Sequence, residues 1–585
     1  MQFLNSRRTS LWSVLAAVTL PTAACSSDAN PDVARAASLP NALSVTQNVQ
    51  MEGVRARRDD SALSAELDRS LPASPDLDVV GAVPIPALAW TDCGDGFQCA
   101  TAAVPRDYSR PRGPTTNLAV TRLPARNASQ RIGSLFVNFG GPGGTAVDTL
   151  HAFGALLFES LNERFDIVGF DPRGVGQSES PIDCQVNQET QGIYAQPFTT
   201  PQRLQGFVAR ARNFVDACVR NNSETTLRFA STANVARDMD ALRAAVGDAK
   251  LSYLGFSFGT FLGATYASLF PGNYRALVLD GALDADQYIN RPSEHLLVQT
   301  SGFERALDRF FEACAANQTA CVGFGGSDPH AAFDDLVARA DAAPIPATGD
   351  DPRPIDGDDI IWVAGNAIYA KQLWPALARA LVAARDGDGT LVRQRANNSY
   401  GRNPDGSYDP GLDRYFALSA VEQRYPSSDV ETYLGAGQAA WEMFDHAFWN
   451  SGYSELPIGL FPIHAQGVFR GPFRASTSAP AILVIGTTYD PATPYREAIR
   501  LATQLRNARL LTMQGDGHTA YGGNSACIDA AVDAYLNQGT VPAAGAACQQ
   551  EVPFEQLQLQ ARAAEARRAA LSALRADPAF VRALR

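Results

Sequence analysis

Short apolar runs alternate with helical segments along much of the chain. Seven runs rich in apolar residues each end near Gly, Asp or Asn: NLAVTRL, SLFVNF, FDIVGF, LSYLGF, RALVLDGA, AILVIGT and ARLLTMQG. Segments rich in Ala, Leu and Arg, such as TANVARDMDALRAAVG, lie between several of them. Apolar strands separated by helices are typical of a buried, mostly parallel sheet with crossover helices. The pattern therefore predicts an α/β fold.

The alternation stops after VLDGALDAD and returns only at residue 481. Residues 285–470 carry helical patterns instead, including FERALDRFFEACAAN, AAFDDLVARADAA and YAKQLWPALARALVAAR. We interpret this stretch as a large helical cap, inserted after the sixth strand and covering the carboxyl edge of the sheet. We expect its aromatic side chains to form the core of the cap rather than a substrate wall. They include Trp362, Trp374, Trp441, Trp449, Tyr369, Tyr415, Phe416 and Tyr433.

The cap divides the predicted sheet domain into two parts, residues 89–284 and 471–550. Residues 25–88 are rich in Ala, Ser, Asp and Pro, and we predict a disordered tether there. Residues 551–585 are Arg-rich and helical in pattern, which favours a helix that is either solvated or packed on the surface.

The N-terminal residues 1–24 are predicted to be a signal peptide. Arg7 and Arg8 precede an apolar run and small residues, and the run is too short for an ordinary membrane span. Cys25 follows, which resembles a bacterial lipoprotein signal that ends in a lipidated cysteine. Cleavage after Ala24 without lipidation is the alternative. Either way, the sequence predicts export, to the cell envelope as a lipoprotein or as a periplasmic or secreted protein.

Composition and charge narrow the class of partner. Of 585 residues, 45% are hydrophobic and 19% are charged, so the chain can bury a large core. The net charge of −12 argues against binding to a nucleic-acid backbone. A membrane contact is expected only through the N-terminal lipid anchor.

Eight cysteines remain when Cys25 is set aside, and an even number in an exported chain favours disulfides. These cysteines fall into four pairs whose members lie close together in the sequence. We predict the pairs Cys93–Cys99, Cys184–Cys218, Cys314–Cys321 and Cys527–Cys548. A metal site is disfavoured because no histidine stands at ligand spacing from any pair. No metal and no cofactor are therefore expected.

The stretch GFSFG places Ser257 between Gly255 and Gly259. Alone, a G-x-S-x-G motif is a modest signal because small residues recur in loops. Here it follows the predicted strand LSYLGF and opens the helical segment GTFLGATYASLF, as a nucleophile elbow does. We therefore predict Ser257 as a nucleophile and the backbone N–H of Phe258 as one donor of an oxyanion hole.

A glycine-rich loop, GGPGG at residues 140–144, follows the predicted strand SLFVNF. Such a loop supplies the second oxyanion donor in folds with a nucleophile elbow. The N–H of Gly141 is our first choice for this donor and that of Gly140 the second. The loop lacks the lysine and the spacing of a phosphate-binding motif.

The general base and its acid are expected late in the chain. His518 follows the last predicted strand in LLTMQGDGHTAYG, and Asp490 follows the strand before it in AILVIGTTYDPATP. Asp490 would hold the imidazole tautomer and stabilise the imidazolium. Asp280 and Asp284, after the preceding strand, are its competitors. The other histidines are His151, His295, His330, His446 and His464.

Three neighbouring charged residues are expected to have structural roles. Asp516 lies two residues before His518, so its side chain should point elsewhere. In FDIVGFDPRGVGQS, Asp171 and Arg173 are expected to form an ion pair near the site.

These motifs, with DPRGVGQS, YDPATP and GDGHTAYG, resemble the α/β-hydrolase family of prolyl and tripeptidyl aminopeptidases over roughly residues 89–550. The resemblance is closest to exported bacterial tripeptidyl aminopeptidases, whose TAP-like C-terminal segment contains the acid and the histidine. Similar actinobacterial envelope hydrolases are lipid-anchored, as Cys25 suggests here. Phe139 stands where prolyl aminopeptidases have the histidine of H-G-G-P-G, which disfavours narrow specificity for an N-terminal proline.

The resemblance implies an α/β-hydrolase fold and an exported serine aminopeptidase that releases tripeptides or other short units from peptides with a free N-terminus. Carboxylates that could bind the substrate ammonium are available in the cap, and none is assigned: Glu294, Glu304, Glu312, Asp358 and Asp359. A carboxylesterase or lipase-like hydrolase with the same triad is the alternative. A catalytically inactive envelope-binding protein is a third hypothesis, and the intact Ser–Asp–His order argues against it.

Overall fold

The computed structural model describes residues 82–187, 189, 201–425, 427–446, 452–552, 570–571 and 573–583. All of them belong to one compact unit. The predicted signal peptide, Cys25, nearly all of the predicted tether and Trp449 lie outside the described residues. Within the described ranges, no helix is long and apolar enough to cross a membrane.

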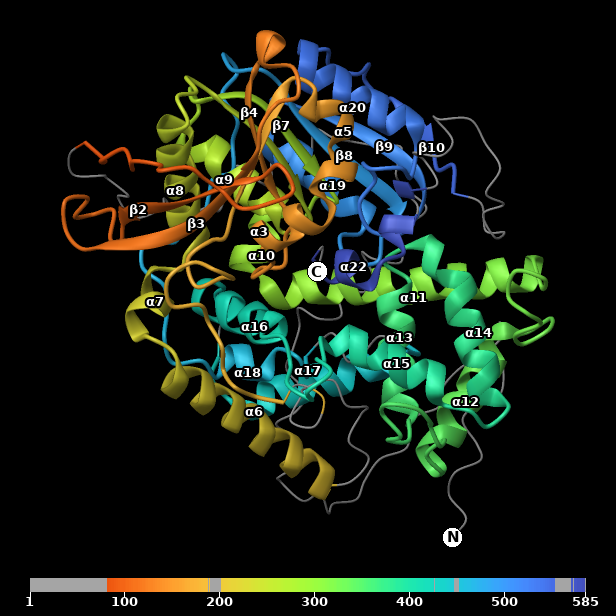
Figure 1. Ribbon diagram of the computed structural model, residues 1–585. Helices are drawn as coiled ribbons and strands as arrows, with labels where there is room; N and C mark the ends of the chain where they lie inside the picture. The colour runs from red at the N-terminus through yellow and green to blue at the C-terminus, as the bar shows by residue number, and fades with distance from the viewer. Residues whose placement is uncertain are drawn as a thin grey trace, which may run out of the picture. The chain divides into compact units, whose positions relative to one another are not determined.

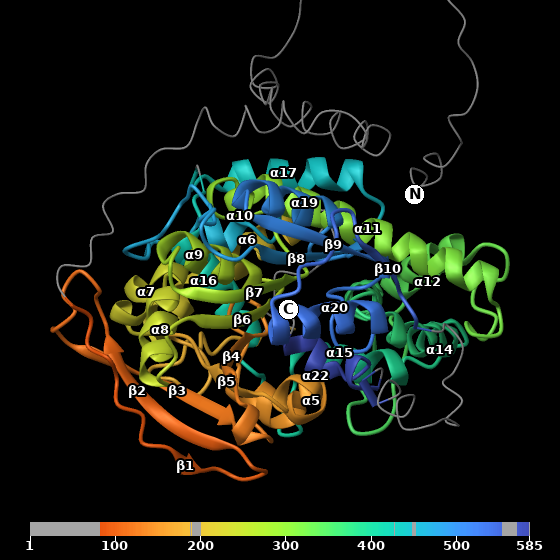
Figure 2. The same ribbon diagram turned by 90° about the horizontal axis from the view of Figure 1, so that it is seen from above.

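A single sheet runs through the described part of the chain, with the strand order β1-β2-β3-β5-β4-β6-β7-β8-β9-β10 (Figure 2). The strands are β1 (Thr91–Asp92), β2 (Gln98–Pro105), β3 (Thr115–Leu123), β4 (Gly133–Asn138), β5 (Phe165–Phe170), β6 (Leu251–Phe256), β7 (Tyr274–Asp280), β8 (Ile482–Tyr489), β9 (Ala508–Asp516) and β10 (Ala547–Gln549). The pairings that involve β1 to β3 are antiparallel, and all the others are parallel.

Every residue of β4, β5 and β6 is buried, as expected for parallel strands that are covered on both faces. Side chains alternate between two cores: Phe136 packs on one face, whereas Leu135 and Val137 pack on the other. All seven apolar runs form strands, so the prediction of a mostly parallel α/β sheet is confirmed.

Helices cover both faces of this sheet. One face packs against α8 (Thr232–Ala245), α9 (Gly259–Leu269) and α19 (Tyr495–Leu505). The other packs against α4 (Ala155–Leu157), α5 (Glu159–Asn162) and α20 (Ala526–Gln538), and the short helix α3 (Val147–Thr149) contacts β3. Helix α8 begins after Ser231, whose side chain accepts a hydrogen bond from the N–H of Asn234.

A helical layer lies between β7 and β8 in the sequence, and Figure 1 shows it gathered on one side of the sheet. It contains α10 (Ala285–Asn290), α11 (Pro292–Ala316), α12 (Pro329–Ala342), α13 (Gly357–Ala367), α14 (Trp374–Arg385), α15 (Thr390–Tyr400), α16 (Gly411–Glu422), α17 (Val430–Met443) and α18 (Leu456–Gly459). The insertion follows the seventh strand in chain order rather than the sixth, and two of those seven strands, β1 and β2, match none of the seven apolar runs.

Part of this layer comes from an earlier stretch of the chain. Helices α6 (Pro201–Asn221) and α7 (Glu224–Phe229) lie between β5 and β6 in the sequence. Phe214 of α6 packs edge-to-face on Phe416 of α16, at 5.6 Å between ring centroids. Phe207 packs in the same way on Tyr453. The layer therefore joins two segments that the sequence separates.

The structure contains the four predicted disulfides, Cys93–Cys99, Cys184–Cys218, Cys314–Cys321 and Cys527–Cys548. Cys184–Cys218 ties the loop after β5 to α6, and Cys527–Cys548 ties α20 to β10. These bonds therefore link neighbouring elements rather than distant parts of the fold.

Candidate active site

Ser257 occupies the turn between β6 and α9. Its φ angle is +54°, a region that residues with a side chain rarely adopt. A Cβ added at Gly255 would lie 2.5 Å from the carbonyl oxygen of Gly259, and one added at Gly259 would lie 2.8 Å from Oδ1 of Asn138. The two glycines therefore allow close packing of the turn, whereas the strained backbone angle belongs to Ser257 itself.

The glycine-rich loop packs directly on this turn. Gly140 has a φ of +102°, and a Cβ added there would lie 2.8 Å from Cβ of Ser257 and 3.2 Å from the N atom of Phe258. The N–H of Gly140 already donates to Oδ1 of Asn138, at 3.1 Å. The N–H groups of Gly141 and Phe258 have no acceptor among the described residues. The loop thus leaves these two donors available, which favours Gly141 over Gly140.

His518 and Asp490 form a buried pair. Nδ1 of His518 lies 2.9 Å and 3.0 Å from the two carboxylate oxygens of Asp490. The N–H groups of Ala492 and Thr493 also donate to this carboxylate, each at 2.9 Å. Nε2 of His518 is buried and has no partner in the described part of the chain. A proton held on Nδ1 by Asp490 leaves Nε2 free to accept one.

The end of β7 brings this pair to the serine turn. The N–H of Ser257 donates to the carbonyl oxygen of Asp280, at 2.9 Å. A Cβ added at the next residue, Gly281, would lie 3.1 Å from Cε1 of His518. Ser257 and His518 therefore lie on either side of Asp280 and Gly281, at the carboxyl edge of the sheet.

The two competing acids serve other parts of the fold. The Asp280 carboxylate accepts from the N–H groups of Ala520 and Tyr521, at 2.9 Å and 2.8 Å, and burial raises its pKa to about 6. It thereby fixes the loop that follows His518. Asp284 caps helix α10 by accepting from the N–H of Gln287. The structure thus brings Asp490, and neither competitor, to the imidazole.

The predicted ion pair between Asp171 and Arg173 is wrong. The Arg173 guanidinium instead binds Asp238 of α8, with 2.6 Å between Nε and Oδ2. Asp171 accepts from backbone N–H groups, those of Ala146, Val147 and Gln177. Because the carboxylate of Asp171 accepts these hydrogen bonds from buried N–H groups at the start of α3, it is not available to Arg173. Asp516 does point away from His518, toward Arg309 and Lys371.

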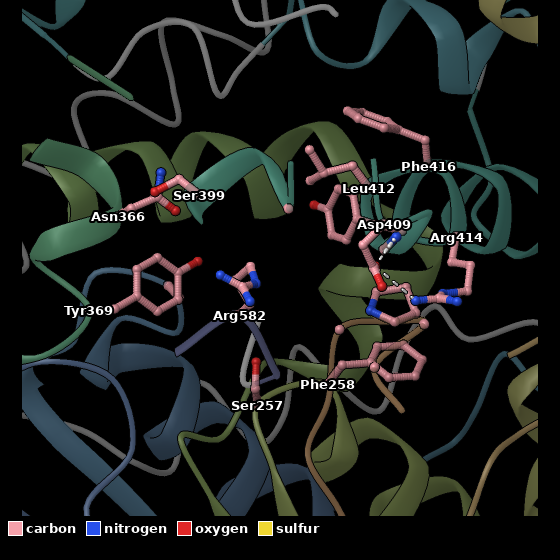
Figure 3. Close-up of a pocket in the computed structure, with 18 of the residues that line it drawn as sticks. Ser257, Phe258, Asn366, Tyr369, Ser399, Asp409, Leu412, Arg414, Phe416 and Arg582 are labelled. Carbon is pink, nitrogen blue, oxygen red and sulfur yellow. Dashed lines mark hydrogen bonds and ion pairs between the residues drawn. The ribbon is translucent and has the colours of Figure 1, made fainter. Parts of the chain in front are cut away.

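A cavity of about 450 Å³ opens above Ser257, between the sheet and the helical layer (Figure 3). Its floor includes Phe258 and the glycine-rich loop. Its walls include Trp362, Tyr369, Tyr415 and Phe416. The prediction that the aromatic side chains form the core of the cap is confirmed for the described ones, because each belongs to a hydrophobic core of the layer or packs against it: Trp362, Trp374, Trp441, Tyr369, Tyr415, Phe416 and Tyr433. The four wall residues have both roles, which the sequence did not predict.

Charged side chains also line this cavity. None of the five acidic cap residues considered from the sequence is among them, and the carboxylates that line it within the described ranges are those of Asp148 and Asp409. The lining guanidinium groups are those of Arg402, Arg414 and Arg582. Sequence reasoning missed all five residues because they lie in no recognisable motif.

Among the residues that the structure describes, two groups of side chains have the composition of a metal site. Cys93 and Cys99 approach His151, but their sulfurs are joined in a disulfide and offer no thiolate. His330 and Asp334 meet His446 in the helical layer. There, Glu304 and Asp334 each lie 2.8 Å from a ring nitrogen of His446. Burial lowers the pKa of His446, but these hydrogen bonds raise it to about 9, so the ring is an imidazolium between two carboxylates.

Known proteins resemble the chain over most of its length. The sequence profile of the alpha/beta hydrolase fold matches residues 135–320, and that of TAP-like proteins matches residues 468–548. Serine protease Hip1 of Mycobacterium tuberculosis is 35% identical over 484 residues, which cover 79% of this chain and 91% of that protein. Carboxylesterase B of the same organism is 33% identical over 79% of this chain and 90% of its own length.

Tripeptidyl aminopeptidase of Streptomyces lividans is 30% identical over 488 residues, which cover 79% of this chain and 86% of that protein. The matched regions contain the serine turn, the Asp490–His518 pair and the sheet that positions them. These similarities confirm the resemblance first suggested by the sequence motifs. The chain therefore belongs to the α/β-hydrolase family, in its TAP-like group.

Proposed function

We propose that the protein is a serine peptidase that releases tripeptides or other short units from peptides with a free N-terminus. The observation that carries this proposal is the buried Asp490–His518 pair, which lies, like Ser257, beside the end of β7 and below a cavity. Relatives named serine protease and tripeptidyl aminopeptidase support a peptide as the substrate.

In the proposed reaction, Oγ of Ser257 attacks the scissile carbonyl carbon while Nε2 of His518 takes the hydroxyl proton. Asp490 keeps the other ring proton on Nδ1 and stabilises the imidazolium. The N–H groups of Gly141 and Phe258 bind the oxyanion of the tetrahedral intermediate. His518 then protonates the leaving amine, and water hydrolyses the acyl-enzyme by the same route.

The cavity would hold the acyl part of the substrate, which includes its ammonium group. Asp148 and Asp409 are the carboxylates among the lining residues, so one of them would pair with this ammonium. Asp409 also lies 3.2 Å from Arg414, which fixes its orientation. The helical layer above them would limit how many residues fit between the ammonium and Ser257.

An ester hydrolase is the second candidate, because the relative named Carboxylesterase B covers as much of this chain as the peptidases do. The same serine, histidine and oxyanion donors would act on an ester. Substrate recognition rather than the triad would then separate the two functions.

Three substrates distinguish the candidates: Ala-Pro-Ala-p-nitroanilide, its N-acetyl derivative and p-nitrophenyl butyrate. We expect the free peptide to be hydrolysed with a kcat/KM at least about 100-fold above that of the acetylated one, because acetylation removes the ammonium charge. The Ser257→Ala variant serves as the blank. Equal rates on free and blocked peptides, or hydrolysis of the ester alone, would overturn the aminopeptidase proposal.

We also propose that the protein is exported, and its four disulfides support an oxidising compartment. The mass of the mature N-terminal peptide tests lipid attachment at Cys25. A diacylated cysteine supports an envelope lipoprotein, and an unmodified N-terminus indicates free secretion.

A further inference from the structure

The C-terminal tail, residues 570–571 and 573–583, reaches the candidate active site from beyond the TAP-like match, which ends at residue 548. Leu571, Leu574 and Phe580 are buried in the core on one face of the sheet. Helix α22 (Pro578–Ala583) packs against α15 (Figure 2). The tail is therefore an integral part of the fold.

Arg575 anchors this tail to the loop that follows His518. Its side chain is buried, with Nε 2.8 Å from the carbonyl oxygen of Gly522 and Nη1 3.1 Å from Oγ1 of Thr519. It also donates to the carbonyl oxygen of Tyr521. Thr519 has a φ of +63°, so the contact falls on a constrained segment. These hydrogen bonds fix where the following helix, α22, lies.

Seven residues later in the sequence, Arg582 lines the cavity. Figure 3 shows its side chain between Tyr369 and Asp409, on the side of the cavity that faces Ser257. Its Nη1 donates to the carbonyl oxygen of Asn398, at 2.6 Å. Within the described ranges, no carboxylate forms an ion pair with it.

Two carboxylates, those of Asp409 and Asp577, interact with this guanidinium electrostatically, but neither is within ion-pair distance of it. Arg414 pairs with Asp409. Arg402 also lines the cavity, and its electrostatic partner is Asp405, outside the lining residues. Asp148 is engaged by the side-chain amide of Gln177, at 2.7 Å. A planar guanidinium in such a partly desolvated site is suited to bind a carboxylate through two parallel hydrogen bonds.

We propose that Arg582 forms a carboxylate-binding subsite, so that the enzyme prefers substrates with an acidic group on the acyl side of the scissile bond. For a peptide, this group is an Asp or Glu side chain among the residues released. The identification of the substrate as a peptide rests on the proposed function, whereas the charge preference applies equally to an acyl ester.

The test uses tripeptide p-nitroanilides that carry Glu or the neutral isostere Gln at the first, second or third position, with Ala elsewhere. For the wild-type protein we expect kcat/KM to be at least about tenfold higher with Glu than with Gln at one position, and this ratio to fall as NaCl is added. The Arg582→Gln variant should bring the ratio at that position close to one. Arg582→Glu should invert it.

Arg379→Gln is the matched control, because it removes an exposed guanidinium from α14 and should leave the Glu/Gln ratio unchanged. A wild-type ratio near one at all three positions, or a preference for Glu that survives in both Arg582 variants, would overturn the proposal. The salt dependence of the wild-type protein gives a readout even if a variant does not fold.

A pair of esters separates this proposal from the proposed function: mono-p-nitrophenyl glutarate, which is charged, and p-nitrophenyl hexanoate, which is neutral. Hydrolysis of esters alone, with an Arg582-dependent preference for the glutarate, would refute the peptidase proposal and support the subsite. Peptide hydrolysis without any charge preference would refute the subsite and support the peptidase.

Discussion

The strand ends and the helical layer hold their polar side chains in different ways. At the strand ends, backbone groups fix the candidate catalytic residues: Ser257 donates to the Asp280 carbonyl, and two N–H groups bind Asp490. In the cavity, Asp409 has a side chain that is 58% exposed, and Arg582 comes from the far end of the chain. We therefore propose that the sheet positions the chemistry and that the layer and tail select the substrate.

The largest effect is expected at the strand ends, from Ser257→Ala. We expect kcat/KM to fall by at least about 10⁴-fold, because the variant has no nucleophile. Thermal unfolding should stay within a few degrees of the wild type, since the hydroxyl makes no hydrogen bond that the fold requires. Residual activity above about 1% of wild type would place the chemistry elsewhere.

The second-largest effect is expected from Asp490→Asn. We expect kcat to fall by about 10³- to 10⁴-fold, because an amide allows the wrong imidazole tautomer. Asp284→Asn is its matched control, since it changes another buried carboxylate near the same edge. We expect the control to lower the unfolding temperature and to keep kcat within about tenfold. Equal losses of kcat in the two variants would remove the distinction between Asp490 and its competitor.

Gly140→Ala should lower kcat/KM by about 10²- to 10³-fold, the range measured when an oxyanion donor is lost. The added methyl would press on Ser257 and displace the loop that carries Gly141. Gly247→Ala is the comparison, because Gly247 also has a positive φ, +85°, but a Cβ there meets nothing within 4 Å. If both variants lose activity equally, backbone strain rather than contact with Ser257 is responsible.

The smallest effect on activity is expected from His446→Gln in the helical layer, where the effect is on stability. The pKa of His446 is raised to about 9 in the folded protein, from 6.5. The protonated ring therefore makes its full contribution to the free energy of unfolding below pH 6.5, and this contribution is lost as the pH rises through 9. Urea unfolding should show the wild type more stable by roughly 3 kcal/mol at pH 6, with that advantage gone by pH 10. A difference that does not change with pH would contradict the imidazolium assignment.

The sequence predicted the strand ends well because parallel strands place their loops at one edge, so local motifs identify neighbours in space. Asp490 and His518 are 28 residues apart, yet each follows a strand of the same sheet. The prediction failed for Arg173 because a charged side chain can pair with a residue 65 positions away, here Asp238, as easily as with one beside it in the sequence. It missed Asp409 and Arg582 because their place in the cavity depends on helix packing, for which no motif exists.

Labelling with a fluorophosphonate tests the central claim most directly, because such reagents modify only activated serines. Peptide mapping by mass spectrometry should show one adduct, on Ser257, and Asp490→Asn should slow its formation at least about 100-fold. An adduct on another residue, or an active protein in which Ser257 stays unmodified, would contradict the account.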